Sequence, residues 1–139
     1  MDVLDTAPPA AYVAPATTPG SAMPSIHDVV QALARREGVD AVVILGADGL
    51  PIDSHTVDGV DPEVVAAHLP ALLQACEELG QQARRGAVTA GVIEYAAGFA
   101  VVANLSRDAK LLVLLQPRSD LGPLLYDLKR HRAEIAGLL

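Results

Sequence analysis

The chain of 139 residues has almost no aromatic side chains and a single cysteine. One Phe, three Tyr and no Trp accompany 51% hydrophobic residues, so the core has to be built from aliphatic side chains. Cys76 has no partner for an internal disulfide, which favours a cytoplasmic protein. The sequence has no run of 18 apolar residues and no basic start before a long apolar stretch, so it predicts neither a membrane span nor a signal peptide.

Basic residues are also scarce, with 10 Lys and Arg against 17 Asp and Glu and a net charge of −7. This balance argues against a general affinity for nucleic acid or anionic membranes. The charge is uneven: residues 25–83 carry 2 basic and 10 acidic side chains, whereas residues 84–139 carry 8 and 5. Our hypothesis is that the acidic part steers a basic partner through Asp61, Glu63, Glu77 and Glu78. The alternative is that these acids only keep an aliphatic domain soluble.

Five of the ten prolines lie in residues 1–24, which we expect to form a disordered Pro/Ala-rich arm before one domain at residues 25–139. The domain should begin with a helix, because Ser25 and Asp28 have the spacing of a capping box. Apolar residues at helical spacing extend this helix to about residue 37.

A hairpin follows, with strands at residues 41–45 and 50–56 joined by the turn signal Asp48-Gly49. Pro51 cannot donate a hydrogen bond to a neighbouring strand, which places the second strand at a sheet edge. Asp61-Pro62 then announces a second helix, expected over residues 62–83. Pro70 lies within that helix, and we expect it to produce a kink rather than two helices.

Three further strands are expected at residues 87–95, 99–105 and 109–115 as an antiparallel meander, followed by a final helix marked by residues 121–138. The strands are apolar on both faces, so helices must cover both sides of the sheet. Two helices on one face and one on the other would leave apolar sheet exposed beside the single helix, which predicts self-association.

In this element order, Ala47-Asp48-Gly49-Leu50-Pro51, the helix end Glu77-Glu78-Leu79-Gly80 and the segment Asp120-Leu121-Gly122-Pro123-Leu124 resemble the roadblock (dynein light chain) family. The resemblance covers residues 25–139 and includes bacterial regulators of Ras-like GTPases. It implies an α+β, profilin-like sandwich of order α-β-β-α-β-β-β-α. Its five-stranded antiparallel sheet would have the order 2-1-5-4-3, with helices on both faces.

The resemblance also implies a homodimer in which the third strands pair and the middle helices pack together. The middle helix has an apolar seam at spacings of four and three residues, formed by Val65, Leu69, Leu72, Cys76 and Leu79. The strand pairing that the resemblance implies adds Val88, Ala90 and Val92 to the expected interface. Such a dimer would bind, and in one bacterial branch activate, a small Ras-like GTPase.

The sequence predicts no catalytic, cofactor-binding or metal-binding residues. The four histidines show no ligand spacing, and the Gly46–Gly49 segment lacks the Lys-Ser/Thr of a phosphate-binding loop. The expected function is therefore a non-catalytic interaction module. A structural scaffold without GTPase contact and a small-ligand sensor are the alternatives.

Overall fold

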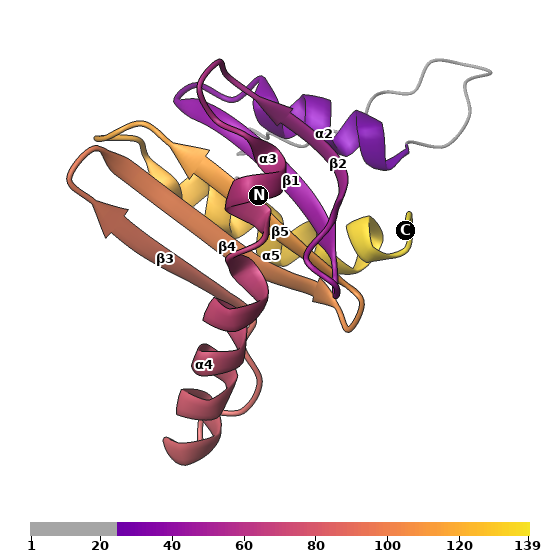
Figure 1. The fold of residues 1–139 in the computed structure, drawn as a ribbon, viewed down its shortest axis with the longest axis vertical. Coiled ribbons are helices and arrows are strands. Elements are labelled where there is room, and N and C mark those ends of the chain that lie inside the picture. Colours follow the sequence, from indigo (N-terminus) through magenta and orange to yellow (C-terminus); the bar gives the residue numbers. More distant parts are fainter. Residues whose placement is uncertain (1–24) are drawn as a thin grey trace, which may run out of the picture.

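A five-stranded antiparallel sheet in the order β2-β1-β5-β4-β3 forms the centre of the molecule (Figure 1). The computed structural model describes residues 25–139, and the arm expected at residues 1–24 lies outside the described residues. The strand order is the one that the family resemblance implies. The strands are β1 (Val39–Gly46), β2 (Pro51–Thr56), β3 (Ala90–Tyr95), β4 (Gly98–Ser106) and β5 (Ala109–Leu115).

Helices cover both faces of this sheet, as its two-sided apolar strands require. One face packs against α2 (Ile26–Ala34) and α5 (Leu121–Ala136), and the other packs against α3 (Pro62–Ala66) and α4 (Leu69–Gln82). The first core is the larger, and its helices are joined by an ion pair between Arg36 Nη1 and Asp127 Oδ2 at 2.9 Å. None of the helices in residues 25–139 is long and apolar enough to cross a bilayer.

Helix α2 begins with the expected capping box. The Ser25 hydroxyl accepts a hydrogen bond from the Asp28 backbone N–H, and the Asp28 carboxylate accepts one from the Ser25 N–H. The hydrogen bond from the Ser25 backbone is the largest cause of a lowered pKa for Asp28. The helix ends at Ala34, before the expected residue 37, because the chain then tightens into a turn in which the Arg36 N–H donates to the Leu33 carbonyl.

The middle helix differs from its prediction, because Pro70 separates two helices instead of kinking one. Helix α3 ends at Ala66, and α4 starts at Leu69 with Pro70 in its first turn. Proline has no N–H to donate to the carbonyl four residues earlier, so a continuous helix would leave the Ala66 carbonyl without its helical partner. The His68 N–H instead donates to the Val65 carbonyl in a tighter turn, and the helix axis changes direction there (Figure 1).

The hairpin between β1 and β2 is confirmed. Its loop is a tight turn in which the Gly49 N–H donates to the Gly46 carbonyl. Gly49 itself has a φ of +86°. The Gly46 N–H donates to the Leu50 carbonyl, so three residues form the loop between this bonded pair. Such a loop requires the left-handed conformation that glycine adopts without strain. Strand β2 is an edge of the sheet, as Pro51 predicts.

Candidate interaction surface

Strand β3 is the second edge of the sheet, and helices leave much of both its faces uncovered. Its six residues are exposed or half-buried, whereas β4 beside it is largely buried. Cross-strand pairing fixes which way each β3 side chain points: Val92 lies opposite Val101 of the α2/α5 core, and Ile93 lies opposite Ala100 of the α3/α4 core. Val92 has 42% of its surface exposed, and Tyr95 has 58%.

An open apolar groove of about 250 Å³ lies on the α3/α4 side of β3. One wall comes from the junction of α3 and α4, and the floor comes from the central strands. The groove is lined by Val65, His68, Leu69, Leu72, Ile93, Tyr95, Ala100, Val102, Leu112 and Leu114. An apolar groove beside an unpaired strand edge is a surface that a second protein chain can cover.

Helix α4 contacts the sheet through its first turns and then projects beyond the sheet (Figure 1). Leu69 and Leu73 are buried in the α3/α4 core and hold the base of the helix. Leu79, two turns further on, has 68% of its surface exposed. The projecting part therefore presents an unpartnered apolar residue to solvent.

The structure brings together only part of the expected interface. Val65, Leu69 and Leu72 line the apolar groove, and Val88 packs against the same core. Cys76 is half-buried further along α4 and is a free thiol. The remaining residues lie apart: Leu79 is on the projecting end of α4, and Ala90 and Val92 are on the opposite face of β3, toward α5.

Sequence reasoning missed Ile93 and Tyr95, which line the groove together with the α4 residues. The alternation of a strand puts Ile93 and Tyr95 on one face, because residues two apart share a face, but it does not show which face lies toward α4. The heptad-like spacing also did not predict the role of Leu73, which is buried although it lies outside the seam. A break at Pro70 shifts which side of the second helix faces the sheet.

The four acidic residues expected to contact a partner fall into two pairs at opposite ends of the α3–α4 segment. Asp61 caps α3 by accepting a hydrogen bond from the Glu63 N–H, and both residues are exposed. Near the end of α4, Glu78 is exposed and accepts a hydrogen bond from Gln74. The pairs therefore form two separate negative positions instead of one cluster.

Glu77 differs from the other three acids because it is bound within the fold. Its Oε2 accepts hydrogen bonds from the Val88 backbone N–H at 3.3 Å and from Asn104 Nδ2 at 3.2 Å. Asn104 Nδ2 also donates to the Val88 carbonyl at 2.9 Å. The carboxylate thus ties α4 to the segment that leads into β3 and to β4.

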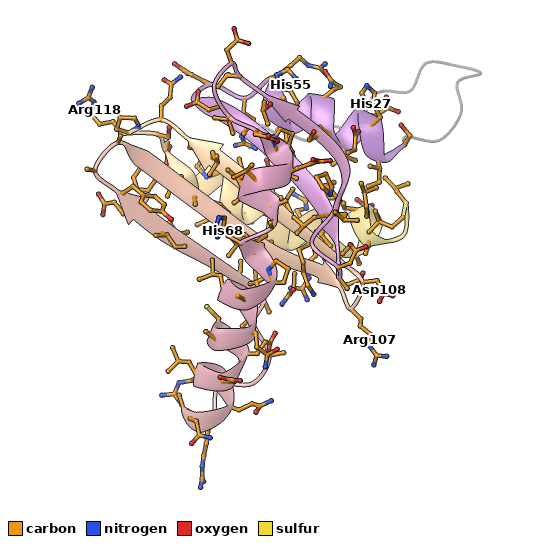
Figure 2. All side chains as sticks on the ribbon, viewed as in Figure 1. His27, His55, His68, Arg107, Asp108 and Arg118 are labelled. Carbon is orange, nitrogen blue, oxygen red and sulfur yellow. The ribbon has the colours of Figure 1, made fainter. Side chains whose placement is uncertain are left out.

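His68 lies well apart from His27 and His55, which belong to the same region around α2 and β2 (Figure 2). His27 contacts Asp53 at 2.9 Å, His55 is on β2, and His68 is at the mouth of the apolar groove. Within residues 25–139, no three His, Cys, Asp or Glu side chains lie close enough together to hold a metal ion. The α3/α4 side of the sheet instead presents an apolar groove and exposed carboxylates, which suit contact with another macromolecule.

Comparison with known proteins agrees with this fold. The family model of the Roadblock/LC7 domain matches residues 25–115. A Roadblock/LC7 domain from Streptomyces avermitilis has a similar structure, with a TM-score of 0.66 and 23% identity over 78% of this chain and 88% of that one. No curated protein sequence gives a significant match.

Two solved MglB proteins are also similar in structure. MglB from Myxococcus xanthus has a TM-score of 0.73 and 18% identity, over 81% of this chain and 93% of that one. The gliding protein MglB from Thermus thermophilus has a TM-score of 0.71 and 14% identity, over 81% of this chain and 87% of that one. At these identities the likeness concerns the fold.

Proposed function

Because the chain belongs to the Roadblock/LC7 domain family, we propose that it is a non-catalytic homodimeric module that binds and regulates a small Ras-like GTPase in the cytoplasm. The observation that carries this proposal is the uncovered edge strand β3 beside the apolar groove. The MglB proteins of similar fold and the family resemblance to bacterial GTPase regulators support the choice of partner.

The dimer forms when β3 pairs with its symmetry mate and the two α4 helices pack over the grooves. Pairing satisfies backbone groups that the free edge leaves to water, and packing buries Tyr95 and Leu79, which are 58% and 68% exposed in the single chain. Leu72 and Ile93, both half-buried in the groove, complete the apolar contact. Homodimer interfaces are richer in apolar surface than the rest of a protein's exterior.

The partner approaches the α3–α4 segment, which carries exposed carboxylates at each of its two ends. Asp61, Glu63 and Glu78 are exposed carboxylates, and they attract a basic patch on the GTPase during encounter. The module changes nucleotide hydrolysis by holding the GTPase in one conformation, without donating a catalytic side chain or a cofactor.

The test starts with purified full-length chain immobilised and exposed to native cytosol loaded with a non-hydrolysable GTP analogue or with GDP. A GTPase retained in one nucleotide state is then purified, and its single-turnover GTP hydrolysis is measured with and without the chain. Leu72→Asp, which removes the proposed dimer, is the matched variant. Retention of a GTPase by wild type but not by Leu72→Asp supports the proposal.

Equal capture by both proteins, or capture of no GTPase in either state, contradicts it. Stable capture of a larger complex independent of nucleotide favours a structural scaffold. A small metabolite that copurifies with the chain favours a ligand sensor.

A further inference from the structure

A second, chemically different groove lies on the opposite face of the sheet, between α5 and the start of β3. It has a volume of about 490 Å³ and is open to solvent. Small side chains hollow it: Ala90 of β3, Ala103 of β4 and Ala133 of α5 all line it, with Leu125 and Leu128 as apolar walls. A volume in this range accommodates a small ligand or the side chains of a docked segment.

The rim of this groove is basic. Lys129, Arg130 and Arg132 of α5 line it, and no acidic side chain does. Within residues 25–139, none of these three cations forms an ion pair with a carboxylate. The Arg130 guanidinium lies 5.9 Å from the centre of the Tyr126 ring, which holds it near the surface without neutralising it.

The acidic residues nearest in sequence are already engaged elsewhere. Asp127 is buried and paired with Arg36 of the α2 turn at 2.9 Å, and Glu134 contacts His131 at 2.8 Å. Glu94 shares the α5-facing side of β3 with Ala90, but it sits at the far end of the strand, opposite Phe99. The positive charge at the groove is therefore not compensated by a lining carboxylate.

We propose that this groove, lined by Lys129, Arg132 and the three alanines, binds an acidic, apolar segment of a partner protein. Apolar side chains of the segment fill the hollow above Ala90 and Ala103, and its carboxylates pair with the cations of α5. An open groove with a charged rim suits a chain segment, which lays one face in the hollow and keeps its other face in water.

The inference goes beyond the proposed GTPase regulation, because the groove is complete within one chain and faces away from the apolar groove beside α4. It matches the uneven charge of the sequence, in which residues 84–139 carry 8 basic and 5 acidic side chains. The protein would then join two partners of opposite charge: a basic one at the acidic α3–α4 segment and an acidic one at α5.

The test uses the full chain, labelled with ¹⁵N, and a synthetic peptide of Leu, Glu and Ala of about 14 residues, which spans roughly 20 Å as a helix. A second peptide replaces every Glu by Gln. The variants are Lys129→Glu/Arg132→Glu, which reverses the rim charge, and Ala133→Leu, which fills the groove at an exposed helical position without changing charge. Arg35→Glu/Arg118→Glu is the control for charge; both residues are exposed and outside the groove lining, and Figure 2 shows Arg118 pointing into solvent.

We expect the acidic peptide to shift the amide resonances of α5, β4 and the start of β3. Its Kd should rise about tenfold or more in Lys129→Glu/Arg132→Glu and in Ala133→Leu, because each variant removes one half of the complementarity. The control should bind as wild type does. Thermal unfolding of each variant shows that the fold is kept, and retention of the GTPase by the groove variants separates this inference from the proposed function.

Three results overturn the inference. The acidic peptide binds all variants equally or not at all, the Gln peptide binds as well as the acidic one, or the shifts lie outside α5, β3 and β4. Groove resonances that move with protein concentration in the absence of peptide would assign the groove to a second copy of the chain. Shifts caused by decanoate alone would assign it to a small amphipathic anion.

Discussion

Gly49 of the β1–β2 turn packs directly against the ring of Pro70 at the start of α4. A Cβ added to Gly49 would lie 3.2 Å from Pro70 Cγ, and the Gly49 backbone has a φ of +86°. The turn of the first hairpin and the residue that divides the middle helix therefore lie against each other. This contact holds the α3–α4 junction against the hairpin, next to the groove that forms the proposed dimer surface.

Gly49→Ala should destabilise the protein by about 1–3 kcal/mol, because a side chain is strained at positive φ and crowds Pro70. In a Pro70→Ala background the cost should be smaller, since only the backbone strain remains. Urea unfolding of the four proteins measures this coupling. An equal loss of unfolding free energy in both backgrounds would show that the contact with Pro70 adds nothing to the cost of Gly49→Ala.

Leu72 and Leu73 are neighbours with different expected roles. Leu72→Asp should yield a folded monomer, because Leu72 lines the open groove, whereas Leu73→Ala should cost about 2–5 kcal/mol of stability, because Leu73 is buried in the core. Analytical ultracentrifugation reports the first effect and circular dichroism the second. A Leu72→Asp protein that remains dimeric would refute the placement of the interface.

Glu77 and Glu78 form a matched pair for stability. Glu77→Ala leaves the Val88 N–H and one of the two N–H donors of the Asn104 amide without their acceptor and should cost about 1–3 kcal/mol. Glu78 is exposed and bonds only to Gln74 among the described residues, so Glu78→Ala should change stability by less than about 0.5 kcal/mol. Denaturant unfolding measures the loss of stability in each variant. Similar losses in Glu77→Ala and Glu78→Ala would contradict the structural role assigned to Glu77.

Asp61→Asn/Glu63→Gln/Glu78→Gln should slow association with the GTPase to roughly a tenth of the wild-type rate. The association rate should also depend less steeply on salt concentration. Asn still caps α3, so the fold is preserved. Asp108→Asn/Glu134→Gln removes exposed acids from the other part of the chain, away from β3, and should leave the rate unchanged. Surface plasmon resonance at several salt concentrations gives both rates, and an unaltered triple variant would show that these acids serve solubility alone.

Asp28 should make stability depend on acid pH. Its pKa lies below the ordinary value of 3.8 because the folded state donates hydrogen bonds to its carboxylate, above all from the Ser25 backbone. The resulting stabilisation is present above the unfolded pKa and is lost as pH falls through the folded pKa. The Tm difference between wild type and Asp28→Asn should therefore be largest near neutral pH and shrink in acid.

Asp58→Asn is the control for that measurement. Asp58 is exposed in the loop before α3, and its carboxylate accepts no hydrogen bond within the described residues. Its substitution measures the Tm change caused by removing an exposed acid that has no such bonds. A Tm difference for Asp28→Asn that stays constant with pH would mean that the capping box is no stronger when the Asp28 carboxylate is charged.

Local signals predicted most of the fold. Ser25 and Asp28, Asp48-Gly49 and Asp61-Pro62 each act through bonds to residues within four positions, so the starts of α2 and α3 and the first turn followed from the sequence. Pro70 was interpreted wrongly for a physical reason. A proline can kink a helix or end it, and the spacing of apolar residues does not distinguish the two outcomes. In this fold Pro70 lies against Gly49, which is far away in the sequence.

The candidate surface was also predicted only as far as it depends on local sequence. The seam spacing found Leu69 and Leu72, but the direction of each β3 side chain depended on its partner in β4, which only the sheet register supplies. Glu77 looked like a surface acid because the sequence does not show that Val88 and Asn104 reach it. Local periodicity identifies apolar faces, and it cannot tell which of them another element covers.

The sequence by itself determined the strand and helix order, the need to cover both faces of the sheet and the concentration of acids in residues 25–83, because these depend on composition and short-range bonding. Only the tertiary structure decided that β3 is left uncovered, that Glu77 is bound within the fold and that Lys129, Arg130 and Arg132 border a hollow without a carboxylate partner. These features arise from contacts between elements far apart along the chain, where packing sets which surfaces remain free to bind.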